Sequence, residues 1–337
     1  MSDGRVRVGV VGAGAVAQVA HLVALPKLSE AEVVAICDTD LAKAGALASR
    51  IGVRDVYDDV EDMFAHAHPD AVVICTPSHL HEVHVIAALS AGVHVLCERP
   101  LALSPAGVER VADAQEKSGL AVIVGMNLRF RSDVQAALSF SASGELGDLT
   151  AIRGGWYMFR PIGPELGWRV SKRQAGGGAM IDMGLPLVDL ALWIAGFPKH
   201  MAVSAQLSPI RRGDAVEDTG CALIRCDGGP SIFVDVSWRH VGEKERAWFE
   251  LIGTRGSAKM SPLRVFKELH GTPVNVTPTG AQSRLNIYNA SYGAEWAHFL
   301  AVVRGEAEVP ALDEQWSLHR VLEAIWQSAE QNREIVL

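Results

Sequence analysis

The residues with the clearest chemical pattern lie at the start of the chain. A β-branched run, 5–11, stops at Gly12-Ala13-Gly14-Ala15-Val16-Ala17, and an amphipathic segment follows. This order predicts a strand, a glycine turn of the form G-x-G-x-x-A, and a helix. Gly12 permits the tight turn, Gly14 lets a pyrophosphate approach the backbone, and the helix start would hold the phosphates. The predicted dinucleotide contacts are therefore Gly12, Gly14, Ala15 and Val16.

A carboxylate follows at the expected distance from these glycines. A second apolar run, 32–37, ends at Asp38, about 20 residues after the turn, where the acid of a dinucleotide fold lies. Such a carboxylate accepts hydrogen bonds from the ribose hydroxyls and repels a 2′-phosphate, so NAD is favoured as the cofactor. Lys43 and Arg50 lie downstream and leave NADP possible. A cofactor-free scaffold of the same shape is the alternative.

The composition limits the class of protein. A chain of 337 residues with 49% hydrophobic residues suggests two domains with sizeable cores. The net charge of −8 argues against a nucleic-acid partner and gives no basic surface for a membrane. We see no signal-peptide pattern and no apolar run of membrane-spanning length. The five cysteines suggest buried thiols in a reducing cytoplasm.

The first third of the chain alternates apolar runs with amphipathic segments. We expect strands at 5–11, 32–37, 70–75, 94–98 and 121–125, and helices at 15–25, 40–51, 58–66, 78–91 and 104–118. Strands that alternate with helices predict a parallel sheet covered on both faces. Residues 1–127 are therefore predicted to form an α/β, doubly wound Rossmann domain.

The pattern changes after about residue 127. We expect a strand at 149–159, an irregular stretch at 161–178, an apolar helix at 179–195, several strands over 200–261, a loop at 271–284, and helices at 294–304 and 313–331. Ile232, Val234 and Val236 share one face of a strand, which indicates a sheet with one buried face. Residues 128–337 are predicted to form an α+β domain with a mostly antiparallel sheet.

Several motifs together resemble the Gfo/Idh/MocA family of NAD(P)-dependent oxidoreductases, which includes glucose–fructose oxidoreductase and inositol dehydrogenase. These motifs are the glycine turn, Thr76-Pro77-Ser78-His79-Leu80-His81, Glu98-Arg99-Pro100-Leu101-Ala102, Gly125-Met126-Asn127-Leu128-Arg129-Phe130, Trp168-Arg169, and residues 176–184. The resemblance spans essentially the whole chain. It implies hydride transfer at a sugar or polyol carbon, and a homodimer or homotetramer formed through the sheet of the second domain.

The resemblance also implies further residues at the site. At the cofactor they are Thr76, Pro77, His81, Glu98, Arg99 and Asn127, with Glu98 near the nicotinamide ribose. At a small-molecule substrate they are Arg129, Trp168, Arg169, Asp182 and Pro186.

The family's catalytic set is present only in part. Its Lys, Asp and His correspond to Arg99, Asp182 and Pro186 in this chain. Hydride leaves an alcohol carbon only if the hydroxyl proton is removed, and an arginine cannot accept that proton because its pKa stays above about 12. We therefore expect Asp182 to transfer the proton, with Tyr157 as an alternative, and Arg99 to orient or polarise the substrate oxygen.

The replacements leave alternatives open. The protein is a dehydrogenase, an NAD-binding sensor or scaffold that has lost this activity, or a redox-neutral enzyme with tightly bound NAD. Arg99 and Asp182 can also be read as structural residues. Five basic residues are either solvated charges or a site for an anionic sugar derivative: Arg129, Arg160, Arg169, Lys172 and Arg173. The spacing of His79, His81 and His84 matches no known metal site, so no metal is predicted.

Overall fold

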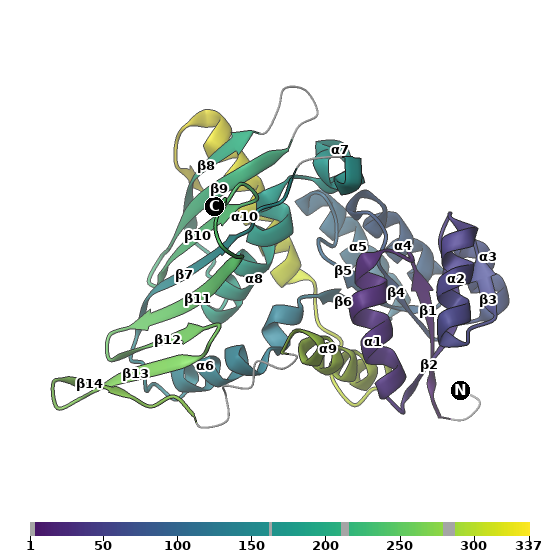
Figure 1. Cartoon of the computed structure of the whole chain (residues 1–337), viewed down its shortest axis with the longest axis horizontal. Helices are drawn as coiled ribbons and strands as arrows, with labels where there is room; N and C mark the ends of the chain where they lie inside the picture. Colours follow the sequence, from purple (N-terminus) through teal and green to yellow (C-terminus); the bar gives the residue numbers. More distant parts are fainter. Residues whose placement is uncertain (1–3, 162–163, 210–215, 279–286) are drawn as a thin grey trace. The chain divides into compact units, whose positions relative to one another are not determined.

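The chain folds into two compact units in a computed structural model that describes residues 4–161, 164–209, 216–278 and 287–337 (Figure 1). The first unit comprises Met1–Phe130 and Tyr288–Asp313, and the second comprises Arg131–Ile287 and Glu314–Leu337. The chain therefore passes between the units three times rather than once near residue 127, because Tyr288–Asp313 belongs to the first unit.

The first unit contains a six-stranded parallel sheet in the order β3-β2-β1-β4-β5-β6. The strands are β1 (Val6–Val11), β2 (Ala31–Cys37), β3 (Asp55–Tyr57), β4 (Ala71–Ile74), β5 (His94–Glu98) and β6 (Val122–Gly125). Strand β3 was not expected. The order reverses between β1 and β4, and in open α/β sheets ligands bind at such a point, beyond the carboxyl ends of the strands.

Helices cover both faces of this sheet. They are η1 (Ala17–His21), α1 (Leu22–Ala24), η2 (Leu25–Lys27), α2 (Leu41–Ile51), α3 (Val60–Ala67), η3 (Ser78–Leu80), α4 (His81–Ser90), α5 (Pro105–Ser118) and η4 (Asn127–Phe130). Helices α1 and α2 share a core with alternate residues of β1, whereas Gly9 of β1 faces Met63 of α3 on the opposite side. Ser104 caps α5 by accepting a hydrogen bond from Gly107 N, with Pro105 in the first turn, as predicted.

Helix α9 (Ile287–Val303) completes the core of the first unit. Trp296, Phe299 and Leu300 pack with residues of β1 and α1. The expected helix at 294–304 therefore starts seven residues too late, because its first turns carry Ser291 and Glu295 at buried positions and show no apolar stripe.

The second unit contains a nine-stranded sheet in the order β14-β13-β12-β11-β7-β10-β9-β8-β15. The strands are β7 (Leu149–Tyr157), β8 (Met201–Pro209), β9 (Glu217–Cys226), β10 (Ser231–Ser237), β11 (Arg246–Gly253), β12 (Gly256–Met260), β13 (Arg264–Leu269), β14 (Thr272–Asn275) and β15 (Ile335–Val336). Strands β7 and β10 are parallel and the other pairs are antiparallel, as the prediction of a mostly antiparallel sheet requires.

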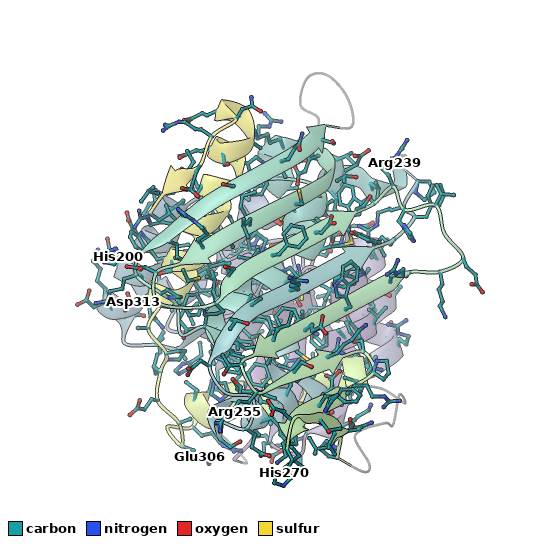
Figure 2. The ribbon with its side chains drawn as sticks, turned by 90° about the vertical axis from the view of Figure 1, so that its left-hand side faces the viewer. His200, Arg239, Arg255, His270, Glu306 and Asp313 are labelled. Carbon is teal, nitrogen blue, oxygen red and sulfur yellow. The ribbon has the colours of Figure 1, made fainter. Side chains whose placement is uncertain are left out.

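One face of this sheet is packed against helices and the other carries side chains that stand clear of them (Figure 2). Ile232, Val234 and Val236 are fully buried on the packed face, as predicted. The helices of the unit are α6 (Ser132–Ala142), η5 (Pro164–Val170), α7 (Lys172–Ala175), η6 (Met180–Gly184), α8 (Leu185–Ile194) and α10 (Asp313–Gln331).

Two expectations for the second unit are corrected. Thr272–Asn275 is a strand rather than loop: it pairs only with β13 at the sheet edge, so it shows no apolar alternation, while residues 279–286 lie outside the described part. The helical segment Lys172–Ile194 is long and apolar enough to cross a membrane, contrary to expectation. Because 78% of its most apolar stretch is buried inside the structure, it has the character of a core helix.

Candidate active-site residues

The glycine turn after β1 has the close packing that a dinucleotide cradle needs. Gly12 has φ +93°, and a Cβ there would lie 2.8 Å from the backbone of Cys75 at the end of β4. At Gly14 the nearest atom to an added Cβ would be 3.8 Å away, so the backbone there is open to approach. Ala17 is fully buried where the helix meets the sheet. Ala15 is exposed and Val16 half-buried. These residues fit a bound pyrophosphate.

Asp38 lies beside this turn at the end of β2. Its carboxylate accepts hydrogen bonds from Ala13 N at 2.7 Å and Asp40 N at 3.0 Å, and it pairs with Lys43 Nζ at 2.9 Å. Burial alone would raise the pKa of Asp38, but these hydrogen bonds and the Lys43 charge lower it below its ordinary value. The carboxylate is therefore charged near neutral pH, and Lys43 is already engaged by it.

Two histidines, His81 and His84, make hydrogen bonds that hold the turn after β4 in place. His81 is buried, with Nε2 2.8 Å from Thr76 O and Nδ1 2.6 Å from Pro100 O. Thr76 Oγ1 also contacts His84 Nδ1 at 3.1 Å. His81 therefore joins the turns that follow β4 and β5, which favours a bracing role over the direct cofactor contact that we expected; Thr76 and Pro77 are half-buried at this turn.

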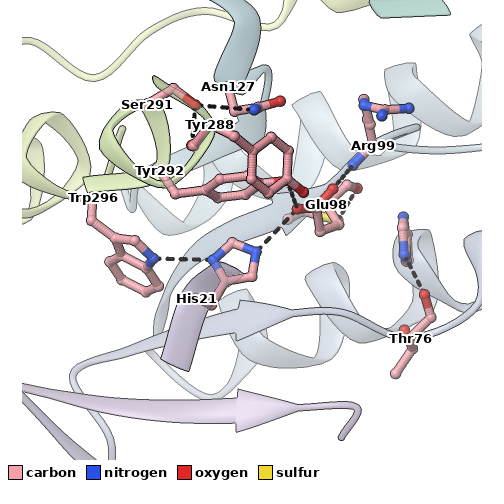
Figure 3. A network of polar contacts seen from close by, with 11 residues as sticks. His21, Thr76, Glu98, Arg99, Asn127, Tyr288, Ser291, Tyr292 and Trp296 are labelled. Atoms are coloured by element: carbon pink, nitrogen blue, oxygen red, sulfur yellow. Dashed lines mark hydrogen bonds and ion pairs between the residues drawn. The ribbon is translucent and has the colours of Figure 1, made fainter. Parts of the chain in front are cut away.

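Glu98, at the end of β5, is the centre of a buried polar network (Figure 3). Its Oε1 lies 3.0 Å from His21 Nε2 and 3.5 Å from the Tyr292 hydroxyl, and its Oε2 accepts a hydrogen bond from Arg99 N at 3.3 Å. His21 Nδ1 in turn accepts from Trp296 Nε1 at 3.0 Å. Sequence reasoning missed His21, Tyr292 and Trp296, because no local motif marks them.

Two buried carboxyl groups in this region have pKa values that are shifted in opposite directions. Burial alone would raise the pKa of Glu98, but the hydrogen bond from His21 and the charge of Arg99 lower it below its ordinary value. Glu295 of α9 is fully buried, and neither of its carboxyl oxygens has a hydrogen-bond partner among the described residues. Burial, and then the charge of Glu98, raise the pKa of Glu295 well above its ordinary value. The fold therefore favours the charged form of Glu98 and the neutral form of Glu295.

Asn127 follows β6 and is held by α9. Its Nδ2 donates to Ser291 Oγ at 3.1 Å, and Ser291 Oγ donates to Tyr288 O at 2.7 Å. Arg99 and Arg129 are half-buried on the same unit. The carboxyl ends of β1, β2, β4, β5 and β6 thus supply the cofactor residues that the sequence predicts, with His81 as the exception.

In the second unit, Asp182 lies in a cluster of cations. Its Oδ2 accepts hydrogen bonds from Arg160 Nη1 at 2.6 Å and from Trp238 Nε1 at 3.0 Å. The Arg169 guanidinium stacks 4.7 Å from the Trp168 ring centre. Burial lowers the pKa of Arg169, and the Asp182 charge opposes this effect. The structure therefore groups Asp182, Arg160 and Arg169, all of which the sequence singles out.

Glu217 anchors the turn that carries Asp182. Glu217 Oε1 accepts hydrogen bonds from Gly178 N at 2.8 Å and Met180 N at 2.9 Å, and Gly178 O accepts from Asp182 N at 2.9 Å. A Cβ on Gly178 would lie 2.0 Å from Glu217 O, so only glycine fits. In the sequence, only the three glycines at 176–178 mark this turn. Glu217 is the first residue of β9, much later in the chain, so no local pattern connects it with the turn.

Two predicted residues lie away from this cluster. The Tyr157 hydroxyl donates to Asp235 Oδ2, and both side chains project from the face of the sheet opposite to Trp238. Burial, and then Asp235, raise the pKa of Tyr157 to about 12. This position argues against proton transfer by Tyr157 next to Asp182. Pro186 is buried in the first turn of α8, where it cannot replace the family's histidine as a proton-transfer group.

Comparison with known proteins agrees with both units. Residues 6–126 match the family described as "Oxidoreductase family, NAD-binding Rossmann fold", and residues 134–259 match the "GFO/IDH/MocA C-terminal domain". D-glucoside 3-dehydrogenase of Escherichia coli K12 is 29% identical, with 100% of this chain and 99% of that protein covered. Myo-inositol 2-dehydrogenase of Thermotoga maritima is 29% identical over 74% of this chain and 73% of that protein.

A solved structure shares the whole architecture. Levoglucosan dehydrogenase in complex with NADH and levoglucosan matches with a TM-score of 0.86 and 25% identity, covering 98% of this chain and 99% of that one. The predicted fold class, nicotinamide cofactor and family resemblance are therefore confirmed. The protein belongs to the Gfo/Idh/MocA family of NAD(P)-dependent oxidoreductases.

Proposed function

We propose that this protein is a dehydrogenase that transfers hydride between NAD and a CH–OH carbon of a sugar or polyol. The observation that carries the proposal is the intact cradle of Gly12 and Gly14 beside the ionised Asp38. Bound nicotinamide would supply the hydride acceptor or donor. Glu98 would hold the nicotinamide end of the cofactor, because its carboxylate lies at the carboxyl end of β5. The relatives named above act on glucosides, myo-inositol and levoglucosan.

NAD is favoured over NADP because Asp38 occupies the position of the adenosine ribose acid. Its charge repels a 2′-phosphate, and Lys43 is paired with Asp38 rather than placed to receive one.

The substrate would be an anionic sugar derivative, such as a sugar acid or a phosphorylated sugar. Arg160 and Arg169 contribute two positive charges around the single carboxylate of Asp182. Trp168 offers an aromatic ring beside Arg169. We therefore assign substrate binding in the second unit to Trp168, Arg169 and Asp182. Because Asp182 Oδ2 already accepts hydrogen bonds from Arg160 and Trp238, Asp182 is better suited to orient this cluster than to act as the base.

Arg99 would donate hydrogen bonds to the substrate oxygen. A guanidinium can stabilise negative charge on that oxygen as hydride moves, although it cannot accept the proton.

The proposal is tested first by cofactor binding and then by turnover. NADH and NADPH are titrated into the protein, with energy transfer from tryptophan to the nicotinamide as the signal. Alkyl glucosides, myo-inositol, levoglucosan and hexuronates are then tested as substrates with NAD⁺. We expect tight NADH binding, weaker NADPH binding and turnover fastest with a hexuronate. Asp182→Asn and Arg99→Ala should each lower turnover.

Other outcomes would replace the proposal. Binding of neither nucleotide would overturn it. Binding without turnover on any polyol would support a sensor or scaffold. Conversion of a sugar without net change in NADH absorbance, with a cofactor that does not exchange, would support a redox-neutral enzyme.

We also propose that the protein is a cytoplasmic homo-oligomer that associates through the sheet of the second unit. Phe233 of β10 pairs with Leu223 of β9, and both side chains are partly exposed. Exposed apolar side chains on a broad sheet are typical of association sites. The five cysteines are free thiols, as is usual in a reducing compartment. Sedimentation of the native protein and of Phe233→Glu tests the interface: the variant should shift towards monomer.

A further inference from the structure

A line of hydroxyl groups leads from the surface of the first unit to the Glu98 carboxylate (Figure 3). The Tyr288 hydroxyl lies 3.3 Å from the Tyr292 hydroxyl, which lies 3.5 Å from Glu98 Oε1. Tyr288 is 50% exposed, whereas Tyr292 is 4% and Glu98 8% exposed. Both distances are longer than those of strong O–H···O hydrogen bonds.

The chemistry of the end groups fixes the direction of every hydrogen bond in the line. The Trp296 indole can only donate, so His21 Nδ1 accepts and the proton of His21 is on Nε2, directed at Glu98. A carboxylate can only accept, so the Tyr292 hydroxyl donates to Glu98. The Tyr292 oxygen is then left to accept the proton of Tyr288.

Because each hydroxyl in the line donates towards Glu98, the Tyr288 oxygen at the exposed end can receive a proton. Tyr288 gives its hydrogen to Tyr292, so the lone pairs of its exposed oxygen can accept a hydrogen bond from outside. Each hydroxyl can pass its own hydrogen inward as it takes one from outside, so no tyrosinate has to form. This matters because burial, and then the charge of Glu98, raise the pKa of Tyr292 far above its ordinary value.

The inner end of the line carries the negative charge. Glu98 is ionised because His21 donates to it and Arg99 lies beside it, while neighbouring Glu295 stays neutral.

We propose that Tyr288, Tyr292 and Glu98 form a proton relay that replaces the lysine base missing at position 99. The proposal rests on the proposed dehydrogenase function. Bound NAD⁺ would supply the hydride acceptor for the substrate C–H, and the hydroxyl proton of the substrate would move to Tyr288. The Tyr288 proton moves to Tyr292, and the Tyr292 proton moves to Glu98. The products are a carbonyl compound, NADH and a protonated Glu98, which then loses its proton to water. Charge is conserved, since a cation and a carboxylate become two neutral groups.

The first experiment needs no substrate. The affinity for NAD⁺, whose nicotinamide is positively charged, is measured by titration calorimetry from pH 3 to pH 8. The relay predicts that affinity falls at acid pH as Glu98 gains a proton. Tyr292→Phe should move the midpoint of this fall to higher pH, because the carboxylate loses a donated hydrogen bond. Tyr288→Phe should move it less.

Other titratable groups face Glu98, and variants separate them from it. These groups are His21, His81, Arg99, Tyr292, Glu295, Cys75 and Cys97. Glu98→Gln should remove the part of the acid-side fall whose midpoint Tyr292→Phe moves, which assigns that part to Glu98 rather than to Asp38 or a histidine. Two control variants should retain the pH profile of NAD⁺ affinity seen in the unmodified protein. Glu295→Gln keeps the shape of a carboxyl group whose neutral form is favoured. Tyr57→Phe removes a hydroxyl that is not part of the line. An unchanged midpoint in Tyr292→Phe, or a fall in Glu98→Gln as large as in the unmodified protein, overturns the relay.

The second experiment uses the sugar that turns over best. Tyr288→Phe and Tyr292→Phe should each lower kcat by about 100-fold, the usual contribution of a positioned proton-transfer group, with KM and NAD⁺ affinity at neutral pH changed less than about twofold. A solvent deuterium effect on kcat should also change in both variants. Full kcat in either variant overturns the relay. If the unmodified protein turns over no sugar, the proposed function fails. The pH profile of NAD⁺ binding still tests the hydrogen bonds that Glu98 accepts.

Discussion

The indole N–H of Trp296 donates to Nδ1 of His21, which lies 275 residues earlier in the chain, and this contact sets the tautomer that points Nε2–H at Glu98. We expect Trp296→Phe to release that restraint. The loss of a buried hydrogen bond and of packing volume should lower the free energy of unfolding by about 1–3 kcal/mol. Urea unfolding measures the loss, and Trp316→Phe in the second unit serves as the control. Equal stability of Trp296→Phe and the unmodified protein would show that the contact is not formed.

The neutral Glu295 should make the protein less stable as pH rises. Its pKa is raised in the folded chain, so its contribution is fully present below the unfolded pKa near 4.5 and is lost as pH rises towards the folded value. A pKa difference of one corresponds to about 1.4 kcal/mol. Glu295→Gln keeps a polar group but cannot ionise, so it should be more stable than the unmodified protein at pH 7. The gain should vanish below about pH 4.5; a gain of equal size at both pH values would contradict the assignment.

Glu98 should have the opposite sign. Its pKa is lowered in the folded chain, so it stabilises the fold above the unfolded pKa near 4.5, and this stabilisation is lost as pH falls through the folded value. Glu98→Gln should therefore flatten the acid side of the stability profile and lower stability at neutral pH. Urea unfolding between pH 3 and pH 7 measures the difference, and a parallel profile for the variant would be evidence that Glu98 is not ionised.

Asp38 should control the choice between NADH and NADPH through Lys43. Asp38→Ala removes the carboxylate that binds ribose and leaves the Lys43 ammonium without its partner. Because hydrogen bonds to charged groups contribute about 1.5–3 kcal/mol, we expect the ratio of the two dissociation constants to move towards NADPH by about 10-fold or more. Asp38→Ala with Lys43→Ala is the matched control and should lose NADH affinity without gaining NADPH affinity. A gain in the double variant would rule out Lys43 as the phosphate ligand.

Glu217 should act on turnover through the position of Asp182. Glu217→Ala leaves Gly178 N and Met180 N without their acceptor, which costs about 1–3 kcal/mol for each buried donor. Glu217→Gln retains an acceptor oxygen and should lose much less. We expect the alanine variant to lower kcat on the best sugar while NADH affinity, a property of the first unit, stays unchanged. A loss of NADH affinity would instead indicate general unfolding.

The glycine turn of the cofactor site was predictable from the sequence because its residues lie close together in the chain. Gly12, Gly14 and Ala17 lie within one turn, and their roles follow from backbone geometry that only small residues permit. The alternation of apolar strands and amphipathic helices likewise predicts the sheet around them, since its periodicity is a local property of the chain. Asp38 could be placed by its distance along the chain from the glycines.

Tertiary structure alone decided which distant side chains meet. Nothing near Glu98 in the chain shows that His21, Tyr292 and Trp296 surround it, because α9 belongs to the first unit but follows strands β7 to β14 of the second in the chain. The pairing of Asp182 with Arg160 and its anchor by Glu217 also arise from packing between elements far apart in sequence. A sequence records which residues can carry charge or a proton. The burial and the hydrogen-bond partners that settle whether Glu98 or Glu295 does so exist only in the folded chain.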